Sequence, residues 1–363
     1  MPERSRLSAH LPAYLNAVGT AVPAHDIHDA FFDWARGRVE PREAAVFARM
    51  ARRSAIRHRW SVLPAAVDGG SPVAPGGFYD ADPLPGTAAR MMVYAQEAPA
   101  LALRAIRALA ETEPLDGITH LVVASCTGFV APGIDQIIAA ELGLDRAERL
   151  LVGFMGCYAA VAALRSARHI VRSEPAARVL VVTVELSTLH LQDARAVEPL
   201  LAMLQFGDGA AAALVTSDAR GLAIGAPFCA TLPDSAALIR WDITDRGFAM
   251  HLSGEVPGRI GAALSDPAFA ARVTGGSDAA TIDAWAVHAG GRSILDAVAH
   301  ALALRPDALD ASRAVLADNG NMSSATLMFV LATLIAGPGI GKGVALAFGP
   351  GLAAEGFAFA SAA

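Results

Sequence analysis

Three short segments supply a thiol, an imidazole and an amide, in that order along the chain. Cys157 lies in a Gly-Cys-Tyr segment, His288 is followed by Ala-Gly-Gly, and Asn321 lies in Gly-Asn-Met-Ser-Ser. A cysteine sulfur can hold an acyl group as a thioester, because nucleophilic side chains form covalent intermediates of this kind. Imidazole and amide donors can stabilise the enolate and the oxyanion that form when a carbon–carbon bond is made beside that thioester. Together the three residue types predict acyl-transfer chemistry.

The surroundings of Cys157 favour a reactive thiol. It follows a predicted strand at 149–154 and a glycine, and it precedes a predicted helix at 158–172. The free N–H groups and the dipole at a helix N-terminus stabilise an anion, which lowers the pKa of a thiol, and a neighbouring imidazole would lower it further. A buried structural cysteine is the alternative. We expect Cys157 to be the nucleophile, whereas Cys126 lacks this context.

His288 and Asn321 are weaker candidates when each is taken alone. His288 ends a predicted strand at 284–288, and the small residues Gly290 and Gly291 leave room for a bulky thioester beside its ring. The alternative is a core histidine with its hydrogen bonds satisfied. Asn321 precedes a predicted helix at 324–335, where asparagine also serves as an N-cap. An internal repeat is what favours the catalytic interpretation of both residues.

Segments of the first half of the chain have counterparts in the second half, in the same order. Residues 118–126 resemble 282–288, residues 156–160 resemble 320–324, and a Phe-Gly-Asp-Gly segment at 206–209 resembles Phe-Gly-Pro-Gly at 348–351. Repeated segments indicate repeated structural units. Two related halves packed face to face would bring Cys157 and Asn321 to mirrored positions, with His288 beside them. Chance similarity among Gly- and Ala-rich strings is the alternative.

Short β-rich runs alternate with helical stretches. This alternation predicts an α/β fold with buried sheets, and the Pro- and Gly-rich residues 64–85 are predicted to be irregular. The predicted strands are 120–124, 149–154, 179–184, 210–215, 284–288 and 343–348, and the predicted helices are 98–111, 134–142, 158–172, 291–304 and 324–335.

Composition excludes several classes of protein. A chain of 363 residues is longer than one compact domain usually is, which favours two domains or a fused duplication. With 54% hydrophobic residues and a mean hydropathy of +0.41, it can fill a large core and bury an oligomer interface. The longest apolar run, 325–337, is too short to span a membrane. A net charge of -6 argues against nucleic-acid binding.

The cysteine content and the N-terminus suggest a reducing compartment. Three cysteines without a Cys-x-x-Cys pair indicate neither a disulfide framework nor a zinc site. The first residues lack a continuous apolar segment, so no signal peptide is predicted. We expect a cytoplasmic protein.

The joint pattern resembles the type III polyketide synthases, the chalcone synthase-like family of thiolase-fold condensing enzymes, with a bacterial rather than a plant character. The resemblance spans about residues 118 to 352, with weaker matches back to Arg49. It implies a thiolase-like fold of two pseudo-repeated αβαβα halves with buried mixed sheets. Residues 1–222 would form the half that carries the cysteine, and residues 223–363 the half that carries the histidine and the asparagine. The matching segments are 152–157, 205–212, 288–291, 320–325 and 348–352.

The family resemblance implies a role for each residue of the set. Cys157 would be loaded with a starter acyl group from coenzyme A. His288 and Asn321 would bind the thioester carbonyl, drive the decarboxylation of malonyl-CoA and stabilise the enolate. The partners are an acyl-CoA starter, malonyl-CoA and a second copy of the chain in a homodimer. The resemblance implies no metal and no redox cofactor.

Further residues match the cavity and the coenzyme A tunnel of the family. Phe206 resembles a gatekeeper aromatic residue, and Met250 stands where plant enzymes have a second gatekeeper phenylalanine. A flexible methionine would admit a longer aliphatic starter, whereas Trp241 would close part of the space. Together these departures from the plant pattern favour alkylpyrone or alkylresorcinol products. The other substrate-binding candidates are Cys126, Thr127, His190 and Ser323, and the candidates for binding coenzyme A are Arg49, Arg53, Gly290 and Gly291.

Three other functions share parts of this pattern. A ketoacyl synthase that works with a carrier protein has the same fold and the same Cys-His-Asn set, but its histidine and asparagine segments differ. The spacing from Cys157 to His288 also fits a papain-like hydrolase, although the Cys-x-x-Cys signature of that family is missing. A non-catalytic acyl-binding protein would not need an intact reactive set.

Overall fold

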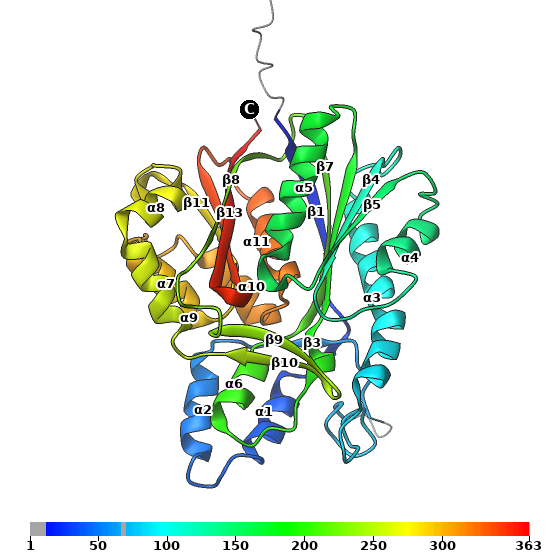
Figure 1. The fold of residues 1–363 in the computed structure, drawn as a ribbon, viewed down its shortest axis with the longest axis vertical. Helices are drawn as coiled ribbons and strands as arrows, with labels where there is room; N and C mark the ends of the chain where they lie inside the picture. The colour runs from blue at the N-terminus through cyan, green and yellow to red at the C-terminus, as the bar shows by residue number, and fades with distance from the viewer. Residues whose placement is uncertain (1–11, 67–69, 363) are drawn as a thin grey trace, which may run out of the picture.

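The computed structural model describes residues 12–66 and 70–362, in which nine strands form one continuous sheet of two halves that join between β1 and β8 (Figure 1). Each half is called a sheet below. In the first sheet, β1 pairs with β7 and β7 with β6 in antiparallel fashion, and β4 pairs in parallel with both β6 and β5. These strands are β1 (Tyr14–Ala21), β4 (His120–Ser125), β5 (Glu148–Gly153), β6 (Val179–Leu186) and β7 (Asp208–Thr216).

The second sheet repeats this order. Here β8 pairs with β13 and β13 with β12 in antiparallel fashion, and β12 pairs in parallel with β11. At the seam, β1 and β8 share two residue pairs, Tyr14 with Ala223 and Leu15 with Leu222. The strands are β8 (Leu222–Thr231), β11 (Ala284–Val287), β12 (Gly343–Gly349) and β13 (Ala353–Ser361). The matching strand order confirms the predicted pseudo-repeat.

Two helices lie between the sheets and form the middle layer (Figure 1). Helix α5 (Ala159–Ser173) is rich in alanine, and helix α11 (Ser324–Ile335) is apolar on nearly all sides. A helix that is apolar all round is suited to burial between two surfaces. Side chains of both helices share one core cluster with strands of both sheets.

Other helices cover the outer faces of the sheets, which completes the predicted αβαβα layers (Figure 1). Helices α3 (Thr87–Ala110) and α4 (Ile134–Glu141) pack on the first sheet. The second sheet is covered by α7 (Val256–Ser265), α8 (Pro267–Thr274), α9 (Arg292–Ala301) and α10 (Asp310–Asn319).

A smaller set of elements lies at one end of the two sheets, at the bottom of Figure 1. It comprises helices α1, α2 and α6 and a hairpin of β9 and β10, which is separate from the main sheets. Their bounds are α1 (His28–Arg36), α2 (Ala44–Arg53), α6 (Val197–Met203), β9 (Ile239–Thr244) and β10 (Gly247–Leu252); β2 (His25–Asp26) and β3 (Trp60–Ser61) form a short ladder beside them.

The predicted elements are present with shifted ends, and several elements were missed. Helix α3 begins at Thr87 rather than at residue 98 and continues through Pro99. Strand β13 has few β-branched residues, so its sequence gives only a weak strand signal. Within the predicted irregular stretch 64–85, residues 67–69 lie outside the described residues. No described helix is both long enough and apolar enough to cross a bilayer.

Candidate active site

Cys157 lies in a single turn of 3-10 helix, Gly156–Tyr158, between β5 and the start of α5. Gly156 adopts a φ of 75°, and a Cβ at that position would lie 2.4 Å from Cδ of Pro350. A glycine is therefore required here both for the left-handed backbone and for the close approach of the Pro350 ring. The turn leaves the Cys157 side chain buried beside the N-terminus of α5.

His288 follows β11 directly, and its ring is almost completely buried. Its backbone N–H donates to the carbonyl of Leu346, which fixes the end of the strand, at 2.8 Å. Neither ring nitrogen has a hydrogen-bond partner, and burial lowers the pKa of His288 to about 3. The imidazole is thus neutral at physiological pH and presents one free donor and one free acceptor.

Asn321 is held by hydrogen bonds of its backbone and of its side chain. Its backbone N–H donates to the Gln205 carbonyl at 2.7 Å. Side-chain Nδ2 donates to the Gly290 carbonyl at 3.2 Å, and Oδ1 accepts from the Ser323 N–H at 2.8 Å. These bonds fix which way the amide points and leave the second Nδ2 hydrogen for the Cys157 thiol, whose pKa this hydrogen bond lowers. Gly290 also lies beside the ring of His288, so Asn321 and His288 share a neighbour.

The thiol of Cys157 is less acidic than the sequence predicts. Burial raises its pKa to about 11, and this effect outweighs the hydrogen bonds to Ser323 and Asn321, which lower it. The negative charge of Glu185 raises the pKa further. His288 does not offset this rise, because both of its ring nitrogens are without a partner. The expected low pKa was therefore wrong, since the helix end and the imidazole do not compensate for the loss of water.

Glu185, near the end of β6, organises the side of the site opposite His288 and was missed in the sequence. Its Oε2 accepts from the Cys126 N–H at 3.0 Å and from the Thr127 hydroxyl at 2.9 Å. Its Oε1 accepts from the Ser324 hydroxyl at 2.5 Å. A single acidic residue in β6, a run that is apolar apart from Thr183, was the signal that could have found it. Cys126 Sγ lies 3.2 Å from the hydroxyl of Ser323.

His190 and Trp241 hold the turn at Cys126 and Thr127 from its other side. The Nε2 atom of His190 bonds to the Thr127 carbonyl at 2.7 Å, and its Nδ1 accepts from the Phe248 N–H at 3.0 Å. This pattern requires a neutral ring, and burial lowers the pKa of His190 to about 3. The indole N–H of Trp241 donates to the Cys126 carbonyl at 2.9 Å.

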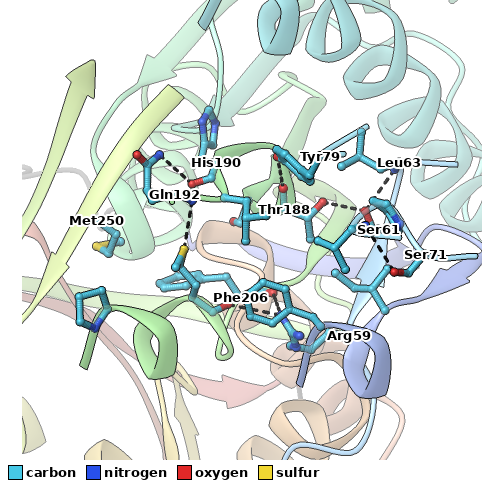
Figure 2. A pocket seen from close by; sticks show the side chains of 18 of the residues that line it. Arg59, Ser61, Leu63, Ser71, Tyr79, Thr188, His190, Gln192, Phe206 and Met250 are labelled. Atoms are coloured by element: carbon cyan, nitrogen blue, oxygen red, sulfur yellow. Dashed lines mark hydrogen bonds between the residues drawn. The ribbon is translucent and has the colours of Figure 1, made fainter. Parts of the chain in front are cut away.

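A cavity of about 70 Å³ lies next to these residues (Figure 2). Phe206, Met250, His190 and Trp241 all line it, so the structure brings four of the predicted substrate-binding residues together. The carbonyl of Phe206 accepts from the buried Arg59 at 3.0 Å. The next residue, Gly207, donates its N–H to the Asn321 carbonyl at 3.0 Å, so the cavity adjoins the asparagine segment.

Two adjoining grooves, of about 530 and 460 Å³, open on the surface near α2, α6 and α9. Arg53 and Arg292 line the first groove, and Gln205 lines both. Gln205 also lies against Gly291, where its side chain would collide with any larger residue. Arg49 is exposed on α2 and does not line either groove. Arg292 was missed, although it directly follows the glycines that the sequence singled out.

Two family models match nearly the whole chain. The model described as chalcone and stilbene synthases, N-terminal domain, matches residues 2–219, and the corresponding C-terminal domain matches residues 226–363. Among curated proteins, the chain is 34% identical over 251 residues to the alpha-pyrone synthesis polyketide synthase-like Pks18 of Mycobacterium tuberculosis, an alignment that covers 66% of this chain and 64% of Pks18. It is 37% identical over 301 residues to bisdemethoxycurcumin synthase of Oryza sativa, covering 77% of this chain and 74% of that enzyme.

Solved structures with the same fold include two polyketide synthases. The C-terminal type III polyketide synthase domain of Steely1 from Dictyostelium superposes with a TM-score of 0.88 at 24% identity, over 97% of this chain and all of that chain. PKS-I from the brown alga Ectocarpus siliculosus superposes with a TM-score of 0.87 at 26% identity, over 98% of this chain and all of that chain. The thiolase-like α/β fold expected from the sequence is therefore confirmed.

Proposed function

The chain belongs to the chalcone and stilbene synthases, which are type III polyketide synthases, and from this membership we propose that it extends an acyl-CoA starter with malonyl-CoA. The starter is held as a thioester on Cys157, and the extended chain is then cyclised in the same protein. The observation that carries the proposal is the position of the Asn321 amide. It bonds to the Cys157 thiol and to the carbonyl of Gly290, and Gly290 lies beside the His288 ring, whose two nitrogens have no partner.

In the loading step, the Cys157 sulfur attacks the carbonyl carbon of the starter thioester. The proton of the thiol passes to the neutral His288 and from there to the departing sulfur of coenzyme A. One carbon–sulfur bond forms and another breaks, so no oxidant or reductant is required. Because the thiol is buried and its pKa is raised, the proton leaves as the attack proceeds rather than beforehand.

In the extension step Cys157 carries the acyl group, so the Nδ2 hydrogen of Asn321 that bonded the thiol and the His288 ring N–H both donate to the carbonyl oxygen of malonyl-CoA. The bond to the carboxylate breaks, carbon dioxide leaves, and its electron pair forms an enolate whose oxygen the two donors stabilise. The enolate carbon then attacks the carbonyl carbon of the Cys157 thioester, a carbon–carbon bond forms and the carbon–sulfur bond breaks. The sulfur leaves as a thiolate and takes up one proton from the solvent. The chemistry is complete without a metal or a redox cofactor.

Coenzyme A binds in the two grooves beside α2 and α9. Arg53 and Arg292 supply positive charge at the rim of the first groove, where guanidinium groups suit phosphate oxygens. The second groove is lined in part by Leu201, Leu252 and Ile294 and suits the less polar arm of the cofactor. Arg49, which is exposed on the same helix as Arg53, would contact a phosphate outside the groove.

The starter is an aliphatic acyl group and the product an alkylpyrone or an alkylresorcinol. The similarity to Pks18, whose name refers to alpha-pyrone synthesis, supports the first of these products. A ketoacyl synthase that takes its substrates from a carrier protein is the second candidate, because it would use the same three residues. The reaction needs the reduced thiol of Cys157, so we place the enzyme in the reducing cytoplasm.

The enzyme acts as a homodimer that forms at the edge of the first sheet. Leu150 and Leu151 on the edge strand β5 and Phe129 in the neighbouring loop are 43%, 44% and 48% exposed. Exposed apolar residues on an edge strand are a liability unless they are covered. A second copy of the chain would cover this face on both molecules at once.

Mass spectrometry of the products tests the proposed function. Purified protein is incubated with malonyl-CoA and acyl-CoA thioesters of graded length, and in parallel with malonyl-carrier protein. We expect polyketide products from malonyl-CoA, and none from a Cys157→Ala variant that keeps its thermal stability. Product formation by that variant would remove Cys157 as the nucleophile. Products from malonyl-carrier protein alone would favour the ketoacyl synthase.

A further inference from the structure

Arg59 is a buried arginine close to the proposed catalytic set, and none of the proposed chemical steps uses it. It directly precedes β3 and is 1% exposed. Burial lowers the pKa of Arg59 to about 10, so the guanidinium is charged at pH 7. One of its nitrogens, Nη2, has no hydrogen-bond partner among the described residues. A buried charged group with an unsatisfied donor costs stability, so the presence of this arginine calls for a functional reason.

The guanidinium holds the turn that follows α6. Its Nη1 donates to the Met203 carbonyl at 3.3 Å and to the Phe206 carbonyl at 3.0 Å (Figure 2). Its Nε donates to Nδ1 of His28 at 3.1 Å. That bond requires a neutral ring, and burial lowers the pKa of His28 to about 4. Hydrogen bonds from a charged donor are stronger than those between neutral groups, so Arg59 fixes this turn firmly from one side.

The same turn holds the backbone of Asn321. The Asn321 N–H donates to the Gln205 carbonyl at 2.7 Å, and the Gly207 N–H donates to the Asn321 carbonyl at 3.0 Å. Phe206, between these two partners, forms a parallel β-bridge with Asn321. Both bonds go to the neighbours of Phe206, so its own carbonyl is left for a donor on the other side, and Arg59 is that donor. Arg59 and Asn321 therefore bind opposite edges of one short segment.

Arg59 also touches the chain just before Asn321. A Cβ at Gly320 would lie 2.9 Å from Cγ of Arg59, so the stem of the arginine packs directly against that glycine. The preceding residue, His58, donates its N–H to the Ala317 carbonyl at 3.1 Å. The segment that carries Arg59 thus contacts both the turn that holds Asn321 and the backbone that leads into it.

We propose that Arg59 is a positioning residue for Asn321 and acts through the backbone of residues 205–207. The inference rests on the proposed function, in which the Asn321 amide donates to the malonyl-CoA carbonyl during extension. In the loading step the proton of the thiol passes through His288, so a displaced Asn321 leaves the route of that proton in place. Arg59 therefore matters for decarboxylation much more than for loading of Cys157.

Two half-reactions separate these steps. Loading is measured with acyl-CoA alone, as acyl-Cys157 detected by mass spectrometry of the intact protein. Decarboxylation is measured with malonyl-CoA in a Cys157→Ala background, where carbon dioxide leaves and the enolate takes a proton from solvent to give acetyl-CoA. We expect Arg59→Met to slow decarboxylation by about tenfold to a hundredfold, because a misplaced donor has an effect of this size. Loading should slow by less than about threefold.

Arg90 provides a matched control. It is also buried with Nη2 unpartnered among the described residues. Its hydrogen bonds go to the carbonyls of Pro85, Leu189 and Leu191, each at 2.8 Å. Arg90→Met should therefore lower the melting temperature, as Arg59→Met does, but change the two half-reactions by the same factor. A selective loss of decarboxylation in Arg90→Met would show that general loosening is the cause and would overturn the proposal.

A conservative variant keeps the test valid if Arg59→Met does not fold. Arg59→Lys retains the positive charge but replaces the guanidinium fork with a single donor group. It should show the same selective loss of decarboxylation to a smaller degree. Equal changes of loading and decarboxylation in the variant that folds would contradict a positioning role.

A double-mutant cycle tests whether Arg59 acts through Asn321. In an Asn321→Ala background, Arg59→Met should slow decarboxylation by less than about twofold further, because the donor that it positions is already absent. Losses that multiply would give Arg59 a separate role and would refute the inference.

Failure of the proposed function would look different. An unmodified enzyme that neither loads Cys157 nor decarboxylates malonyl-CoA would refute the condensing activity itself. An enzyme that performs both half-reactions, with both altered equally when Arg59 is replaced, would refute the positioning role alone.

Discussion

The pH dependence of Cys157 alkylation should show a thiol without an ionised partner. Burial raises the pKa of this thiol from 9.0 to about 11. At pH 7 the thiolate fraction is then about 1 in 10,000, compared with about 1 in 100 for an unperturbed thiol, a difference of about 2.7 kcal/mol. Burial also keeps His288 neutral, so we expect no thiolate–imidazolium pair before substrate binds.

The assay measures inactivation by iodoacetamide between pH 6 and pH 10. It uses a variant in which the exposed Cys229 is replaced by serine, and peptide mass spectrometry assigns the modified cysteine. The rate constant should rise about tenfold for each pH unit across the whole range, because only the thiolate reacts. An acyl-CoA starter should protect Cys157 from modification.

A matched variant separates burial from ion pairing. In His288→Gln the alkylation profile should keep the same slope, because a neutral imidazole contributes no charge to the thiol. A plateau below about pH 8 in the unmodified enzyme, lost in His288→Gln, would refute the reasoning. It would show that an imidazolium holds Cys157 as a thiolate despite its burial.

Four further predictions concern specificity, stability and assembly. Met250→Phe should shorten the starter that is used best, measured with acyl-CoA thioesters of graded length; an unchanged preference would remove Met250 as a determinant. Burial lowers the pKa of His190 from 6.5 to about 3 in the folded protein. As the pH falls below about 6.5, His190 therefore takes up a proton in the unfolded chain but not in the folded one, and the free energy of unfolding decreases. His190→Gln should remove about 2 kcal/mol of the loss between pH 7.5 and pH 5, measured by urea unfolding, and an unaltered loss would contradict this. The Arg165 guanidinium lies 2.7 Å from the Glu355 carboxylate, whose side chain is 11% exposed. Arg165→Ala removes this partner and should lower the free energy of unfolding by about 2 kcal/mol. A change below about 0.5 kcal/mol would show that water replaces the arginine. Phe129→Asp should shift sedimentation toward a monomer if β5 and its neighbouring loop form the dimer face, and an unchanged dimer would place the interface elsewhere.

The proposed catalytic set of Cys157, His288 and Asn321 could be picked out in the sequence because each member has a marked local context. Glycines precede or follow all three residues, and the structure explains two of them. Gly156 adopts a positive φ against Pro350, and Gly320 adopts a φ of 67° directly before Asn321. A backbone conformation that only glycine adopts easily, directly beside a functional residue, leaves a short sequence motif. Such motifs can be read without knowing the fold.

The charge state of Cys157 and the full lining of the cavity in Figure 2 could not be predicted in this way. The raised pKa of Cys157 depends on how completely water is excluded by segments distant in the chain, and on Glu185, which lies in another strand. The cavity combines Trp241, which the family resemblance pointed to, with Phe31 and Val73, which have no distinctive local context. Volumes enclosed by side chains from separate elements follow from packing and not from motifs.

The narrow seam between the two sheets has a mechanical consequence. β1 and β8 share two residue pairs, and the Ile224 N–H also bonds to the Ala13 carbonyl. Cys157 follows a strand of the first half, whereas His288 follows a strand of the second. The position of the Cys157 sulfur relative to His288 and Asn321 therefore depends on how α5 and α11 pack together between the two halves. Small side chains such as Ala160 and Ala163 on α5 allow neighbouring elements to approach this helix closely. A larger side chain at either position would therefore change the spacing between the two halves, and with it the spacing between Cys157 and His288.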